Sequence, residues 1–322
     1  MFDAAFLEAF HDSIHAASEI IIVVHEYPDL DAIGSALALD MAFSQQGFNS
    51  RIWVAEPLNH SFSFLPELTR VGKKLGNVSD TACIVFLDSS HKERVAQHAL
   101  LDPILEHVVS INIDHHCDNS RFATFNCVQD VSSVGEMISI LCSTLKWPIT
   151  KDMATCLYAA ICFDTGRFAY SNTRSQTMHV VAKLLDTGID PNIIYQEMYE
   201  NKTLSSFKLL KLALDNLIVC REAGYAYTQI PLSAPKGSFK LVDFIRQLKD
   251  IDVFVVIQAV NSHKVKVNLR SKKHFDVSAF ANQFGGGGHV RASGLVFRDM
   301  PLDECVTTII HALDTALAAT AP

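Results

Sequence analysis

The sequence predicts an α/β protein with an N-terminal parallel-sheet domain and a smaller C-terminal α/β domain. Short apolar runs typical of buried strands alternate with helical patterns through the first half of the chain. Histidine and aspartate residues directly follow several of these runs. After Gly188 the pattern changes to a helical stretch, further strand-like segments and a glycine-rich loop. We therefore expect one domain over residues 1–188, a helical linker over 189–214 and a second domain over 215–322.

Four apolar segments predict the strands of the first sheet, and helical patterns lie between or after them. The carboxyl ends of parallel strands share one edge of a sheet, and ligands collect at that edge in such folds. The expected strands cover residues 19–25, 50–56, 82–88 and 107–114. The expected helices cover residues 31–46, with Gly47 as the stop signal, and residues 134–146, 151–164 and 175–188.

The second domain is expected to be basic, in contrast to the rest of the chain. Between Lys236 and Arg298 there are eleven Lys or Arg residues and four Asp residues. This stretch therefore carries about +7, and the remainder carries about −15 of the formal net charge of −8. The acidic part is suited to cations and the basic part to an anionic substrate. The expected strands cover residues 217–220, 225–230, 252–260 and 264–271.

The composition restricts the class of protein. A chain of 322 residues suits two domains, and 49% hydrophobic residues with 19% charged residues allow a sizeable core. No run of about 18 apolar residues occurs, so we expect no membrane span. The first twenty residues have the pattern of an amphipathic helix, not that of a secretion signal. The eight cysteines form no CxxC pair, so we expect buried free thiols and a cytoplasmic location.

Aspartate and histidine residues in four separate segments predict a metal site at one edge of the first sheet. A single acid at the end of a strand is more often a helix N-cap, and paired histidines are often a loop feature. Four such segments in an otherwise apolar domain are not explained by capping. Carboxylate and imidazole donors suit Mn²⁺ or Mg²⁺ better than a thiolate zinc site. The residues are His25, Asp29, Asp31, Asp88, Asp114, His115, His116 and Asp164.

The glycine-rich segment "FGGGGHVRASG" in the basic domain predicts a substrate-binding loop. Bare backbone can approach a ligand closely and point N–H groups at an anion, although a flexible turn is the simpler interpretation of a glycine run. Neighbouring histidine and arginine residues favour binding of a phosphate and ribose. The candidate substrate residues are Arg270, Ser271, Gly286, Gly287, Gly288, His289, Arg291 and Ser293.

The motifs together resemble a known family. The H-x3-D-x-D spacing that begins at His25, the lone Asp88, the triplet in "NIDHH" and the later "DTGRFAYSNT" resemble the DHH phosphoesterase superfamily. The segment "FGGGGHVRASG" resembles the DHHA1 domain that follows in that superfamily. The flanking residues are most similar to the nanoRNase/pAp phosphatase subfamily of the RecJ-like phosphoesterases. The resemblance extends over nearly the whole chain.

The resemblance implies a dinuclear site. Two divalent ions, most often Mn²⁺ with Mg²⁺ or Co²⁺ as alternatives, would activate a hydroxide that attacks phosphorus. The resemblance also implies that Asp88, His116 and Asp114 are catalytic residues. His116 would act as a donor or acid at the scissile phosphate, and Asp114 would orient the histidines. The implied ligands are His25, Asp29 and Asp88 for the first ion, and Asp31, His115, Asp164 and the shared Asp88 for the second.

The expected function is therefore that of a metal-dependent phosphohydrolase acting on short nucleotides in a cleft between two domains. It would release mononucleotides from short oligonucleotides, or remove the 3′-phosphate of adenosine 3′,5′-bisphosphate (pAp). One alternative is a phosphodiesterase for linear or cyclic dinucleotides such as pApA, because the metal site would be the same. Another is a non-catalytic RNA-binding or nucleotide-binding protein. The sequence is also compatible with a homodimer.

Overall fold

The chain folds into two compact units, Met1–Glu200 and Asn201–Pro322. The division falls inside the segment predicted as a linker. There α7 (Pro191–Tyr195) and a π-helical turn (Gln196–Glu200) belong to the first unit, and α8 (Leu204–Asp215) belongs to the second. The computed structural model describes residues 2–55, 57–95, 97–237 and 239–320, and it does not describe the side chains of His289, Ala319 and Thr320.

The first unit contains a six-stranded, fully parallel sheet in the order β3-β2-β1-β4-β5-β6. The four predicted strands are confirmed as β1, β2, β4 and β5, and two strands that were not predicted, β3 and β6, form its edges. Glu56, the predicted last residue of the second strand, lies outside the described residues. The bounds are β1 (Ile20–Val24), β2 (Ser50–Trp53), β3 (Val71–Gly72), β4 (Cys83–Leu87), β5 (Val109–Asp114) and β6 (Phe125–Val128).

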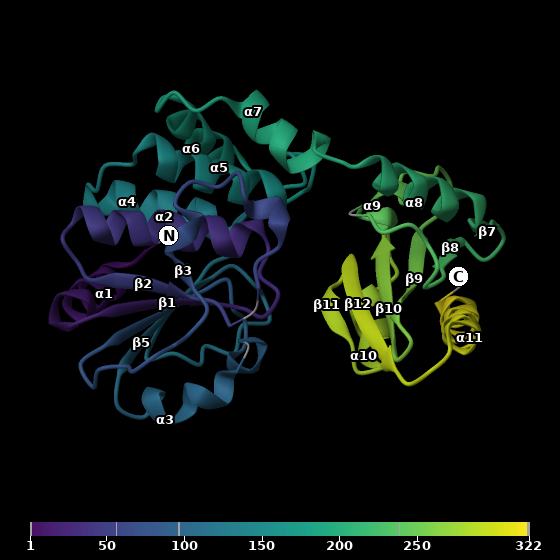
Figure 1. Ribbon diagram of the computed structural model, residues 1–322, viewed down its shortest axis with the longest axis horizontal. Coiled ribbons are helices and arrows are strands. Elements are labelled where there is room, and N and C mark those ends of the chain that lie inside the picture. Colours follow the sequence, from purple (N-terminus) through teal and green to yellow (C-terminus); the bar gives the residue numbers. More distant parts are fainter. Residues whose placement is uncertain (1, 56, 96, 238, 321–322) are drawn as a thin grey trace. The chain divides into compact units, whose positions relative to one another are not determined.

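Helices cover the sheet of the first unit, and α2, α4, α5 and α6 lie together on one side of it (Figure 1). The predicted N-terminal amphipathic helix and the four other predicted helices are confirmed within a few residues. The bounds are α1 (Ala4–Ala16), α2 (Leu30–Gln45), α3 (Asp102–Leu105), α4 (Val134–Leu145), α5 (Lys151–Asp164) and α6 (Ser175–Leu185). Short 3₁₀ turns span His60–Phe62, Leu68–Arg70, Lys92–Arg94 and His98–Leu100.

The central strands β1 and β4 are buried on both faces of the sheet, which explains why they are continuous apolar runs. In β1, Ile20, Ile22 and Val24 pack in the core that includes α2, α4 and α5. Ile21 and Val23 point to the opposite face, where a second apolar cluster packs against them. The alternation follows from the two-residue period of a strand.

The register of the sheet brings three polar residues into one row. Val24 pairs with Leu87, and Leu87 pairs with Ile113. The next residues along the three strands are His25, Asp88 and Asp114. The carboxyl edge of the sheet therefore carries polar groups side by side, although they are far apart in the sequence.

The second unit is built on a smaller mixed sheet in the order β11-β12-β10-β9-β8-β7, in which only β8 and β9 pair in parallel. Helices α8 and α9 pack in one core of this unit, and α10 and α11 contribute to the other. The strands are β7 (Ile218–Cys220), β8 (Tyr225–Ile230), β9 (Val253–Asn261), β10 (Lys264–Ser271), β11 (Gly287–His289) and β12 (Ala292–Arg298). The remaining helices are α9 (Leu241–Ile245), α10 (Val277–Asn282) and α11 (Leu302–Thr320).

One expectation from composition is also met by the structure. The eight cysteines are unpaired, and those inside the apolar segments, among them Cys83, Cys142 and Cys156, are buried. Within the described parts of the chain, none of the helices combines the length and the hydropathy that a membrane crossing requires.

Candidate metal centre

Six of the predicted residues converge at the carboxyl edge of the first sheet, and we call them the acid–histidine cluster. Asp29 is the N-cap of α2, Asp31 lies in its first turn, and Asp164 is the last residue of α5. Among the described residues, ligand atoms form three groups, and within each group the atoms lie within 4.8 Å of one another. Two groups draw on these six residues alone, and the third joins Asp88 and His115 to His116. The cluster consists of His25, Asp29, Asp31, Asp88, His115 and Asp164.

The first group joins His25, Asp29 and Asp88. The Nε2 atom of His25 lies 3.5 Å from Oδ2 of Asp88. The other ring nitrogen of His25, Nδ1, lies 2.8 Å from the backbone oxygen of Glu26. Because that carbonyl can only accept, Nδ1 carries the proton, and Nε2 can present a lone pair to a cation.

The second group joins Asp31, His115 and Asp164. The Nε2 atom of His115 lies 3.2 Å from Oδ2 of Asp164, 3.9 Å from Oδ2 of Asp31 and 3.5 Å from Oδ1 of Asp88. Its Nδ1 faces the carbonyl oxygen of Val131 at 3.3 Å, so this imidazole also directs Nε2 toward the carboxylates.

Asp88 belongs to the first group and also approaches the second, because its Oδ1 lies 3.5 Å from Nε2 of His115. Its φ of 55° lies in the left-handed region, which is unusual for a residue other than glycine and is accessible mainly to Asn and Asp. The side chain is buried, and its Oδ1 accepts no hydrogen bond among the described residues. A buried carboxylate oxygen without a donor is costly, and a divalent cation would satisfy it.

The local pKa values indicate too much negative charge for a site without cations. Burial, followed by the charges of Asp88 and Asp164, raises the pKa of Asp29 to about 6. Burial and the same two carboxylates raise the pKa of Asp31 well above its usual value. Burial alone would lower the pKa of His25, but its hydrogen bond to Asp88 and the charges of Asp88 and Asp29 raise it to about 9. The residues thus fit divalent cations, which would take the place of these protons.

Asp29 and Asp31 also accept hydrogen bonds from backbone N–H groups, so each has a structural role as well as its place in the acid–histidine cluster. Asp29 caps the helix through Oδ1, which accepts from the backbone N–H of Asp31 at 2.9 Å and that of Ala32 at 3.2 Å. Asp31 accepts from the N–H groups of Val134 at 2.7 Å and Gly135 at 2.9 Å, at the start of α4. These bonds fix the carboxylates while leaving Oδ2 of Asp29 and part of the Asp31 lone pairs for other partners.

His116 is held by a second set of polar groups. Its Nδ1 lies 2.7 Å from Oδ1 of Asp114, a fully buried carboxylate, and 3.5 Å from Oδ1 of Asp88. Asn119 donates from Nδ2 to Oδ2 of Asp114 at 2.6 Å and to the backbone oxygen of Ser89 at 3.1 Å. Asn119 therefore supports Asp114 in this arrangement.

Asn172 is a support that sequence reasoning missed. Its Nδ2 donates to the backbone oxygens of Asp164 and Ser132, each at 3.1 Å. It thereby joins the end of α5 to the loop before α4, whose first N–H groups hold Asp31. The only signal in the sequence is its place in "DTGRFAYSNT", eight residues after Asp164.

The predicted substrate residues of the second unit are mostly engaged within that unit. Arg270 donates from Nε to Asp243 at 2.7 Å, and Ser271 donates to the carbonyl of Phe275 at 2.7 Å. The guanidinium of Arg291 contacts the same two groups, with 3.0 Å to the Phe275 carbonyl and 3.4 Å to the Ser271 hydroxyl. The structure therefore brings Ser271 and Arg291 together.

The glycine run forms part of the sheet. Gly287, Gly288 and His289 make up β11, which pairs with β12, and Ser293 of β12 donates to the carbonyl of Val277 at 2.5 Å. A Cβ at Gly286 would overlap the backbone of β12 and lie 2.5 Å from Cβ of Leu295. Close backbone approach therefore requires glycine at position 286. The side chain of His289 lies outside the described part of the chain.

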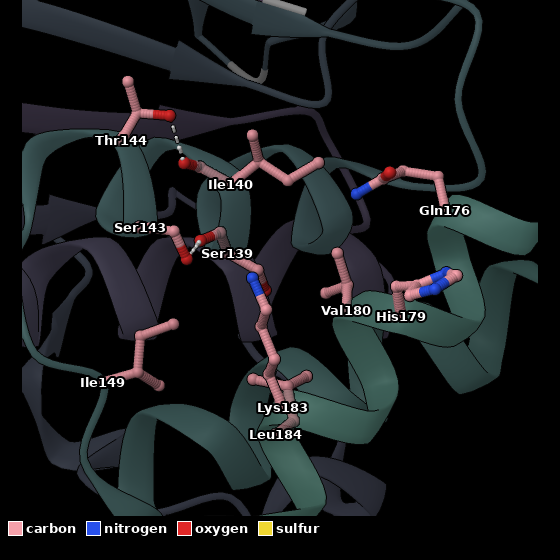
Figure 2. A pocket seen from close by; sticks show the side chains of 10 residues that line it. All are labelled: Ser139, Ile140, Ser143, Thr144, Ile149, Gln176, His179, Val180, Lys183 and Leu184. Carbon is pink, nitrogen blue, oxygen red and sulfur yellow. Dashed lines mark hydrogen bonds between the residues drawn. The ribbon is translucent and has the colours of Figure 1, made fainter.

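A separate pocket of about 220 Å³ opens between α4 and α6 in the first unit (Figure 2). It contains no residue of the acid–histidine cluster. Three hydroxyls of α4 that line it donate to backbone oxygens one helical turn earlier, so they offer no free protons to a ligand. The lining residues are Ser139, Ile140, Ser143, Thr144, Ile149, Gln176, His179, Val180, Lys183 and Leu184.

Comparison with known proteins identifies both units. Residues 19–161 match the DHH family, N-terminal domain, and residues 222–319 match the DHHA1 domain. The bifunctional oligoribonuclease and PAP phosphatase NrnA of Thermus thermophilus is 29% identical over 91% of this chain and 89% of its own length. The cyclic-di-AMP phosphodiesterase PdeA of Listeria monocytogenes is 22% identical over 95% of this chain and 49% of its own length. An exopolyphosphatase-related protein from Bacteroides fragilis superposes with a TM-score of 0.90 at 25% identity, and 98% of each chain is covered.

Proposed function

The chain belongs to the DHH family and carries a DHHA1 domain, and from this premise we propose that it is a metal-dependent phosphohydrolase of short nucleotides. Its substrates would be oligonucleotides a few units long, cleaved to mononucleotides, and adenosine 3′,5′-bisphosphate, cleaved at the 3′-phosphate. The name of the Thermus thermophilus relative, which describes both activities, supports this substrate class.

One observation carries the proposal: six acidic and histidine residues from distant segments converge in groups whose atoms lie within 4.8 Å of one another, and they include Asp88, whose buried Oδ1 accepts no hydrogen bond among the described residues. We propose that His25 and Asp29 hold one divalent ion, that Asp31 and His115 hold a second together with Asp164, and that Asp88 is shared. Hard carboxylate oxygens with one imidazole in each group favour Mn²⁺, with Mg²⁺ or Co²⁺ as alternatives. Such ions supply Lewis acidity and a lowered pKa of water at neutral pH.

The chain's own residues would orient the phosphate and manage protons. His116 would donate to the scissile phosphate or its leaving oxygen, because Asp114 holds its Nδ1 at 2.7 Å and stabilises the protonated imidazole. Burial alone would lower the pKa of His116, but the hydrogen bond to Asp114 and the charge of Asp88 raise it. Asn119 would keep Asp114 in position through its bond at 2.6 Å.

The second unit would bind the terminal phosphate and ribose of the substrate through the β11 backbone and Arg291, with His289 nearby in the chain. Ser271 and Ser293 donate to backbone carbonyls, so we assign them to shaping this surface. We expect Arg291→Ala to raise KM about tenfold while two Mn²⁺ ions still bind. An unchanged KM would remove Arg291 from the substrate site.

A phosphodiesterase for linear or cyclic dinucleotides is the second candidate. The match to the Listeria monocytogenes cyclic-di-AMP phosphodiesterase over 95% of this chain favours it. The same cluster would serve either reaction, so substrate preference has to be measured.

The test is a panel of substrates incubated with purified protein and Mn²⁺, Mg²⁺ or Co²⁺. The panel contains pAp, pApA, a cyclic dinucleotide and an adenosine oligonucleotide of about five units. We expect release of AMP or phosphate from pAp and the oligonucleotide, and no release after chelation. If no product forms from any of these substrates with any of the three metals, the chain is a binding protein instead.

A further inference from the structure

The loop that follows Asp164 contains three consecutive residues with left-handed backbone, Gly166, Arg167 and Phe168, whose φ angles are 55°, 64° and 64°. For the two residues with side chains this conformation is strained, and such strain persists only where surrounding bonds impose it. Thr165 provides some of those bonds: its Oγ1 accepts from the N–H of Phe168 at 3.0 Å, and its carbonyl accepts from the N–H of Tyr170 at 2.9 Å.

The strained turn directs two neighbouring side chains to different places. Phe168 packs edge-on against Tyr158 of α5, with the ring centroids 6.0 Å apart. The guanidinium of Arg167 lies over the ring of Tyr199, 5.1 Å from its centroid, and the side chain of Tyr195 raises the pKa of Arg167. The two tyrosines are neighbours, with centroids 5.1 Å apart. One face of the guanidinium is therefore covered by Tyr199, and Tyr195 lies next to that ring.

Arg167 and Asp164 of the acid–histidine cluster are close together in the sequence. Arg167 is three residues from Asp164, which limits the separation of their Cα atoms to about 11 Å. The ring of Tyr199 also packs against the core cluster that includes Cys162, two residues before Asp164 on α5. Tyr199 belongs to the π-helical turn Gln196–Glu200, and π-helical turns are frequent at functional sites.

The positive charge of Arg167 is accessible to an anionic ligand. Its side chain is exposed, and no carboxylate in the described ranges forms an ion pair with it. Arg174, seven residues later, is also exposed, but it is paired with Asp130 at 2.6 Å. A guanidinium that is oriented by aromatic groups and lacks an acidic partner is suited to a phosphate group.

We propose that Arg167, held over the ring of Tyr199 beside Tyr195, forms a subsite for a further phosphate of a nucleotide chain, next to the phosphate at the cluster. The exposed ring of Tyr170, which packs over Gly166, provides an aromatic surface for the adjoining base. The inference rests on the proposed function, in which the second unit binds the terminal phosphate. A chain of three nucleotides reaches this subsite, and pAp does not, because pAp has no phosphate beyond those two.

The test is equilibrium binding by calorimetry with Mn²⁺ present. The probes are a 5′-phosphorylated adenosine trinucleotide with phosphorothioate linkages, which resists cleavage, and pAp with the equivalent phosphorothioate. We expect Arg167→Ala to weaken trinucleotide binding about tenfold and pAp binding less than twofold. Arg167→Lys, which keeps the charge but loses the planar fork, should lose part of the affinity. Arg174→Ala is the matched control and should bind both probes like the wild type.

The proposal fails if Arg167→Ala binds the trinucleotide as the wild type does, if it weakens pAp equally, or if Arg174→Ala causes the same loss. It also fails if the wild-type protein binds no trinucleotide. Thermal unfolding of each variant checks that the proteins compared in the binding experiments are folded. Turnover of unmodified substrates is measured separately. If the wild type cleaves none of them but Arg167→Ala still weakens trinucleotide binding selectively, the proposed function is overturned and the subsite is retained.

Discussion

Replacement of Asp88 by asparagine tests the central assignment of the metal site. Asparagine has the same shape and adopts the left-handed backbone readily, so it keeps the φ of 55° without added strain. Alanine at this position would add about 1–2 kcal/mol of backbone strain, which would confuse the result. The change therefore removes one negative charge and little else.

The expected loss follows from the partners of this carboxylate. Asp88 faces the Nε2 atoms of His25 and His115 and Nδ1 of His116, each at 3.5 Å. Breaking a buried charge pair by removing one partner costs about 3–5 kcal/mol, and asparagine, which keeps one oxygen, should lie near the lower value. That corresponds to a loss of Mn²⁺ affinity of roughly a hundredfold. Because Asp88 is shared, both binding sites should weaken, and turnover should nearly vanish.

The assay is a Mn²⁺ titration followed by calorimetry or electron paramagnetic resonance, which gives the number of sites as well as their affinities. Asp80→Asn is the control, because Asp80 is an exposed carboxylate that precedes β4, whereas Asp88 follows it. The control should bind two ions with wild-type affinity. Two sites of unchanged affinity in Asp88→Asn would refute the shared-ligand assignment.

Three further outcomes are expected. Asp114→Asn should lower kcat about 10–100-fold with Mn²⁺ affinity nearly unchanged, because it perturbs the support of His116; equal kcat in the two proteins would contradict this role. Mn²⁺ affinity should rise about tenfold per pH unit for each displaced proton between pH 6 and about 9, because the pKa of His25 is near 9 and the ion must displace the proton of this imidazole. Calorimetry in buffers of different ionisation enthalpy measures the release of that proton. A Mn²⁺ affinity that does not change with pH would argue against it. Gly286→Ala should destabilise the second unit by at least about 1 kcal/mol, because its methyl group would overlap the backbone at Gly294; denaturant unfolding checks this, and Mn²⁺ stoichiometry should stay at two.

The periodicity of apolar residues was sufficient to predict most of the fold. The strands that became β1 and β4 are buried along their whole length, and a continuous apolar run is the direct signature of that environment. The edge strands β3 and β6 were missed because they are short and only partly buried, which leaves a weak pattern. In the second unit the glycine run was expected to be a loop, yet part of it pairs as β11, since glycine permits the close approach to β12.

The sequence alone determined which residue types could form a metal site and that they follow the strands of a parallel sheet. Their polarity, in otherwise apolar segments, is a local property that can be read along the chain. Only the tertiary structure decided how each group is used. Asp31 is held by the start of α4, about a hundred residues away, and Asn172 joins α5 to the loop before α4. Hydrogen-bond partners of that kind depend on register and packing, and these arise only when all the segments meet.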